Sequence, residues 1–212
     1  MSQVYKEEIT CPNCNTKGTF TCWSSINVDL DPEAKEKVKN GELFKYTCPK
    51  CGRWYNIEYE TLYHDMSNKF MVQYLCNPTE ERIKQFYNET EQMKKLNLVF
   101  DIRQRIVRDK NAFIEKIMIF ENELDDAIVE VAKTIILQKM IENDPNMEIP
   151  AIYFHSIDDT NISFYIDDGR VLNTDRSLYD SLAETYNSIV PKNEFIEIDL
   201  KNAINYLKEK SN

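Results

Sequence analysis

The chain has 212 residues, of which 42% are hydrophobic and 11% aromatic; this is enough apolar material for a packed core and excludes a disordered chain. The formal net charge is -10, and no part of the chain is basic: even residues 1–78 carry 9 Lys and Arg against 10 Asp and Glu. Because binding to DNA or RNA phosphates needs a local excess of Lys and Arg, this composition disfavours a nucleic-acid partner.

The first part of the chain, residues 1–78, predicts a small β-rich module. Residues 5–10 and 18–28 are rich in Thr, aromatic and β-branched residues, as is typical of strands. A short helix is predicted over 31–40, because Asp31 can cap it, Pro32 fits its first position and Gly41 can end it. Residues 43–65 predict a hairpin with a cysteine pair at its turn, and 69–76 a further strand.

The remaining residues divide into a helical segment, 79–145, continuous with the module, and a C-terminal α+β region, 146–212. The helical segment predicts a helix over 78–96, a strand over 97–107 with Leu98 and Phe100 on one face, and two helices between 111 and 142. The C-terminal region predicts a hairpin over 152–166, a helix over 176–189, a strand over 194–200 and a closing helix over 201–210. The predicted fold class is therefore α+β: an N-terminal zinc-ribbon-like β module with a helical insert, then a helical segment and a small mixed α/β region.

Four cysteines form two Cys-Pro-x-Cys motifs, Cys11 with Cys14 and Cys48 with Cys51. A tight turn across two intervening residues lets both sulfurs of a motif reach one ion. Four thiolates complete a tetrahedron and leave no open position, which is typical of a structural zinc site. The sequence therefore predicts one structural zinc ion as cofactor, with no catalytic role. A redox pair and an iron–sulfur cluster are the alternatives for such motifs.

The N-terminal ten residues lack the apolar segment of a signal peptide, and no stretch of about 20 apolar residues follows. We therefore expect a cytoplasmic protein with no membrane partner, in which the cysteines stay reduced and available to a metal. Cys22 and Cys76 lie outside the two motifs, and both are interpreted as small buried hydrophobic residues.

The two motifs and the segments after them resemble the CpXC domain, a prokaryotic family named for this cysteine pair. After the second motif come GELFKYTCPKCG, TLYHD, KFMVQYL and RIVRDKNAFIEKIMIFENELDDAIVEVAK, in the order expected of the family. The resemblance spans roughly residues 5–135 and leaves out the C-terminal third. It implies metal binding by Cys11, Cys14, Cys48 and Cys51, and it assigns no activity.

Three functions follow as hypotheses. The first is a zinc-stabilised module that binds another protein, favoured by the closed site, the absence of a catalytic motif and aromatics that could lie on the surface: Trp23, Trp54, Tyr55, Tyr59 and Tyr63. The second is an enzyme with a cleft near His64 and Asp65, a pair able to act as an oriented base; the alternative is that His64 only packs at the end of the hairpin. The third is a nucleic-acid-associated zinc ribbon, which the charge disfavours.

Overall fold

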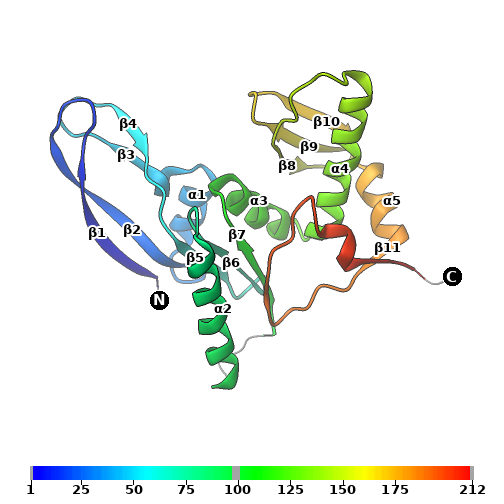
Figure 1. Ribbon diagram of the computed structural model, residues 1–212, viewed down its shortest axis with the longest axis horizontal. Helices are drawn as coiled ribbons and strands as arrows, with labels where there is room; N and C mark the ends of the chain where they lie inside the picture. The colour runs from blue at the N-terminus through cyan, green and yellow to red at the C-terminus, as the bar shows by residue number, and fades with distance from the viewer. Residues whose placement is uncertain (1, 97–100, 211–212) are drawn as a thin grey trace. The chain divides into compact units, whose positions relative to one another are not determined.

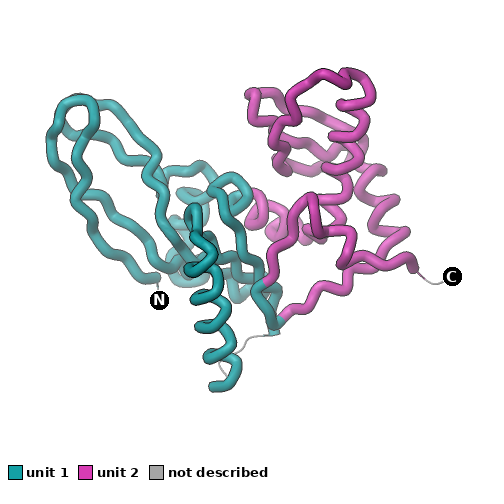
Figure 2. The backbone as a smooth tube through the Cα atoms, in the orientation of Figure 1, with its two compact units in different colours: residues 1–114, 193–195 teal, residues 115–192, 196–212 magenta. Residues whose placement is uncertain are grey.

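The computed structural model describes residues 2–96 and 101–210, which form two compact units (Figures 1 and 2). Unit 1 comprises residues 1–114 and 193–195, and unit 2 comprises residues 115–192 and 196–212. The boundary between them falls within helix α3 (Lys110–Glu121). In the described ranges, no helix combines the length and the apolar character needed to cross a bilayer.

Unit 1 is built on a sheet with the strand order β1-β2-β5-β6-β7-β12. Its strands are β1 (Gln3–Thr10), β2 (Lys17–Asn27), β5 (Thr61–Asp65), β6 (Phe70–Tyr74), β7 (Arg103–Val107) and β12 (Phe195–Ile196). The β1–β2 and β5–β6 pairs are antiparallel, whereas β2–β5 and β6–β7 are parallel. Strand β2 pairs with β1 along its length, but only its last three residues, 25–27, pair with β5. The rest of the β1–β2 hairpin therefore forms an arm beyond the central strands.

A second, short hairpin lies at the end of this arm. The chain leaves β2 through α1 (Pro32–Lys39) and a 3-10 turn (Glu42–Phe44), then forms β3 (Lys45–Thr47) and β4 (Trp54–Asn56), which pair antiparallel. Pro32 occupies the first turn of α1, and Gly41 takes the left-handed conformation at φ 75° that ends it. The helical insert is therefore confirmed, although the Asp31 side chain makes no capping hydrogen bond. The cysteine-bearing hairpin is shorter than the predicted range 43–65, because residues 61–65 form β5 of the six-stranded sheet.

Aromatic rings form a continuous core in unit 1. Phe20 of the arm contacts Tyr46 and Tyr59, with ring centroids 6.3 and 6.0 Å apart. Tyr59 contacts Phe44 at 5.1 Å, and Phe44 contacts Phe113 of α3 at 6.1 Å. Such offset and edge-on pairs add to the burial of large apolar surfaces. The core therefore joins the arm to the central strands, while the metal motifs lie beyond it.

Helix α2 (Glu80–Lys95) begins at Thr79, whose side chain accepts the N–H of Arg82. This capping contact satisfies one of the free N–H groups of the first turn. The helix exposes most of its surface and buries Phe86, which packs with Leu75 and Ile106.

Unit 2 contains the rest of α3, α4 (Asp126–Asn143), α5 (Ser177–Thr185) and two small sheets. A meander in the order β10-β9-β8 is formed by β8 (Ile152–Ile157), β9 (Asn161–Ile166) and β10 (Val171–Asp175). The second sheet pairs β11 (Tyr186–Ser188) with β13 (Leu207–Glu209). Asp125 caps α4 by accepting the N–H groups of Ala127 and Ile128.

The α+β class is confirmed, and most predicted elements are present. Three C-terminal predictions differ from the structure. Residues 201–210 form a 3-10 turn (Ala203–Tyr206) and strand β13 rather than a helix, and the strand predicted over 194–200 is reduced to β12. The helix predicted over 176–189 ends at Thr185, because residues 186–188 form strand β11. The predicted strand over 97–107 is described as β7, and its residues Leu98 and Phe100 lie outside the described ranges.

Candidate metal centre

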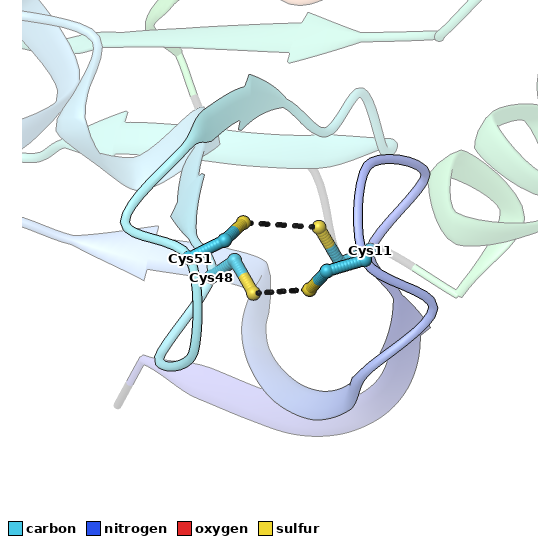
Figure 3. A group of neighbouring side chains, drawn as sticks. Cys11, Cys48 and Cys51 are labelled. Carbon is cyan, nitrogen blue, oxygen red and sulfur yellow. Dashed lines mark hydrogen bonds between the residues drawn. The ribbon is translucent and has the colours of Figure 1, made fainter.

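The four motif cysteines lie in the turns of two hairpins. Cys11 and Cys14 occupy the turn between β1 and β2, and Cys48 and Cys51 occupy the turn between β3 and β4. Figure 3 shows the two turns facing each other with their sulfur atoms between them. Each motif is thus positioned by a pair of antiparallel strands, and residues 40 positions apart in sequence meet at one place.

The two turns have the same hydrogen-bond pattern. Asn15 N–H donates to the Cys11 carbonyl at 2.9 Å, and Gly52 N–H donates to the Cys48 carbonyl at 3.0 Å. The Cys11 and Cys48 N–H groups donate in turn to the carbonyls five residues ahead, at 2.9 and 2.8 Å. Both closing residues are left-handed, with φ 55° for Asn15 and 69° for Gly52. Asn tolerates this conformation better than most residues, which explains how the first turn forms without Gly.

The sulfur positions fit one tetrahedral ion. All four Sγ atoms lie within 4.8 Å of one another, with Cys11 to Cys51 at 3.7 Å and Cys14 to Cys48 at 3.6 Å. A tetrahedron with metal–sulfur bonds of about 2.3 Å has edges of about 3.8 Å, close to these two separations. A disulfide needs about 2.05 Å, and all four are free thiols. The cluster can therefore hold a metal ion by sulfur alone.

Hydrogen bonds favour the thiolate form of part of the cluster. Burial raises the pKa of the Cys11 thiol, but hydrogen bonds with the Tyr55 hydroxyl and with the N–H groups of Cys14 and Asn13 outweigh it and lower the pKa to about 6. The hydroxyl and N–H of Thr16 lower the pKa of Cys14. For Cys48, a backbone N–H lowers the pKa, but burial and the adjacent sulfurs raise it to about 11. A bound cation would favour the deprotonated form of all four sulfurs.

The family model of the CpXC protein matches residues 9–133, more than half of the 212 residues. The chain belongs to the CpXC family. The match covers both cysteine motifs and confirms the resemblance seen in the sequence. Comparisons with curated proteins and with solved structures gave no match.

The other two cysteines of this CpXC protein lie apart from the cluster. Cys22 is buried on β2, and burial raises its pKa, as the interpretation as a small hydrophobic residue predicts. Cys76 is only half-buried, and its sulfur lies 3.8 Å from the Glu58 carboxylate. The prediction that Cys76 is a buried core residue is therefore wrong.

His64 and Asp65 are adjacent on β5, and the strand turns them to opposite faces of the sheet. Burial alternates along this strand, so Asp65 faces the core with Tyr63, whereas His64 lies on the other face. The Asp65 carboxylate accepts hydrogen bonds from the N–H and the side-chain amide of Asn68, at 2.8 and 2.7 Å. The two side chains are therefore not brought together as an oriented base, although His64 lines a cavity.

Of the five aromatics considered as surface residues, two are buried, one is exposed, and Trp23 and Tyr55 are half-buried. Tyr59 and Tyr63 are buried in the core, so their predicted place on the surface is wrong. Trp54 is 58% exposed, and Lys45 Nζ lies 5.1 Å from its ring centroid. Trp54 follows the second cysteine turn directly, so the exposed ring lies next to the cluster.

Proposed function

We propose that this protein binds one zinc ion in a closed four-cysteine site, and that the ion rigidifies two hairpin tips as a surface for binding another protein. The observation that supports it is the sulfur cluster, whose separations of 3.6 and 3.7 Å suit a tetrahedral ion. Thiolates are soft ligands and select zinc over magnesium or calcium. Four protein ligands leave no position for substrate, so the role of the ion is structural.

Besides the metal, the tips are ordered by their short hairpins and by the packing of Tyr46 against Phe20. β3 and β4 have three residues each, and a two-stranded hairpin is marginally stable on its own. Binding of structural zinc contributes about 10–16 kcal/mol in zinc-finger peptides, which is comparable to the stability of a whole domain. Loss of the ion should therefore unfold the arm, while the aromatic core retains the central strands.

Metal analysis and hydrogen exchange test the metal site together. We expect one zinc ion per chain, lost in Cys14→Ala and retained in Cys22→Ala, which removes a cysteine outside the cluster. Chelation should increase amide exchange in residues 3–24 and 45–56 and leave 61–74 protected. If the metal-free protein shows unchanged amide exchange, the ion is not structural. If the purified protein contains iron rather than zinc, the zinc assignment is wrong.

The proposed contact surface is the outer edge of the arm together with the exposed ring beside its second cysteine turn. β1 is an edge strand with exposed Val4 and Tyr5, and Trp54 lies beside the second turn. Edge strands accept an added strand from a partner, and aromatic residues are frequent anchors in interfaces. Trp54→Ser should weaken capture of a partner from the native host at full zinc content. The matched control is Ile204→Ser, which changes a residue 56% exposed in unit 2.

A further inference from the structure

Unit 1 contains a cavity of about 510 Å³ on the sheet face opposite the aromatic core. The sheet side is formed by Leu62 and His64 of β5, Met71 and Gln73 of β6, and Gln104 of β7. The strand register places His64 beside Met71 and Met71 beside Gln104, so these side chains form one row across the sheet. Cavities of about 300–1,000 Å³ are the usual size for small-molecule sites.

Helix α2 and a distant segment complete the cavity. Arg82, Phe86, Glu89 and Met93 line it at the three- and four-residue spacing of one helix face. Phe195 comes from the far end of the chain and packs on Phe86, with ring centroids 5.2 Å apart. Most of the exposed surface of the cavity is apolar, and three of its lining residues are methionines, which adapt to varied ligand shapes.

The charged groups at the cavity already have partners. Arg82 binds the Glu60 carboxylate through Nε and Nη2 at 2.9–3.1 Å. Its Nη1 makes no hydrogen bond, but it lies 3.5 Å from the Glu89 carboxylate, so the guanidinium charge is balanced by two carboxylates. Lys94 Nζ lies 2.7 Å from Glu91 and 3.4 Å from Glu194. A charged ligand would lose its hydration without gaining an unpaired counter-ion, so this lining favours an uncharged ligand.

His64 supplies an unused polar atom. Its Nδ1 is buried and makes no hydrogen bond within the described ranges. Burial lowers the pKa of His64, so the ring is neutral at pH 7 and carries one donor and one acceptor. A hydroxyl can complement either ring nitrogen, because it both donates and accepts.

We propose that this cavity binds a small uncharged molecule with an apolar body and one hydroxyl-type polar group, which hydrogen bonds to His64. The apolar body lies between α2 and the row of sheet residues. The site is separate from the cysteine cluster and needs no metal ion.

The methionine methyl groups report ligand binding directly, and the measurement uses the whole protein. Three of the seven, Met66, Met71 and Met93, line the cavity, whereas Met118, Met140 and Met147 lie elsewhere. In protein labelled with ¹³C-methyl methionine, titration with 1-hexanol should shift the NMR signals of the three cavity methionines and leave the other methionine signals unchanged. The shift should saturate in the millimolar range or below. Hexanoate and hexylammonium, matched in length but charged, should bind at least about tenfold more weakly.

Variants separate the hydrogen bond from the apolar contact. His64→Leu should weaken 1-hexanol binding about tenfold, and His64→Gln should retain most of the affinity. Met93→Trp, at a half-exposed rim position, should block binding with unchanged thermal stability. The proposal fails if 1-hexanol does not saturate the cavity methionines, if hexanoate binds as tightly, or if His64→Leu binds as well as the original protein.

Discussion

Unit 2 contains a buried network of five ionisable side chains, and removal of one of its lysines should destabilise the unit strongly. Lys116 Nζ lies 2.8 Å from Glu130 and 3.3 Å from Asp126. Lys133 Nζ lies 2.8 Å from both Glu115 and Glu130. The Glu115 carboxylate also accepts the N–H of Phe154 at 2.6 Å, which joins the two helices to β8. All five ionisable side chains are at most 4% exposed.

The perturbation is Lys116→Met, which keeps the length of the side chain and removes its charge. Three carboxylates then face one lysine, and Asp126 loses the Lys116 ammonium group, which lies 3.3 Å away. Breaking a buried ion pair by removing one partner costs about 3–5 kcal/mol, because the remaining charge stays buried. For a unit of this size, such a loss should lower the melting temperature by at least about 10 °C.

Thermal and urea unfolding of both variants test this expectation. Arg170→Met is the control, because Arg170 and Asp168 form a 2.6 Å ion pair that is largely exposed and screened by water. The double variant Lys116→Met with Glu130→Met should lose less than the sum of the two single losses. If Lys116→Met is no more destabilising than Arg170→Met, the network does not stabilise unit 2 as argued.

Three further predictions concern single positions. Burial raises the pKa of Glu115. Lys116 and Lys133 outweigh burial at Glu130 and lower its pKa. The stabilisation by Glu130 is therefore present above pH 4.5 and is lost as pH falls. Glu130→Gln should therefore flatten the fall in urea stability at acid pH, whereas Glu115→Gln, which removes a carboxyl group of raised pKa, should not flatten it. A Cβ at Gly18 would lie 2.1 Å from the Tyr46 hydroxyl, so Gly18→Ala should cost about 1–3 kcal/mol in urea unfolding, and Tyr46→Phe should relieve part of it. Asp125→Ala should cost about 0.5–2 kcal/mol through the lost α4 cap, and an unchanged midpoint would contradict the capping role.

The features that follow from local chemistry were predictable from the sequence. The two Cys-Pro-x-Cys turns need only residues within each turn, and the tight turn allows few alternatives. The same holds for α1, whose Pro32 and Gly41 mark its ends. Cys48 and Cys51 at a hairpin turn are equally local, because β3 and β4 flank them directly.

Features that depend on distant partners were not predictable. Residues 201–210 show a helical pattern, but 207–209 pair with β11, which lies some twenty residues earlier. Lys116 and Glu130 carry charges that the sequence gives no reason to bury, and only the packing of α3, α4 and β8 buries them. The cavity combines residues 62 to 195, so no single motif indicates it.

The geometry of β2 separates the metal centre from the cavity within unit 1. Lys17, at one end of the strand, follows the first cysteine turn, and Asn27, at the other end, pairs with His64. At about 3.3 Å per residue, the ten steps between them span about 33 Å. An ion in a closed site at that distance cannot contact a ligand beside His64. Its influence on the cavity must pass through the three paired residues at the root of the arm or through the aromatic core, so metal binding and ligand binding should be separable by mutation.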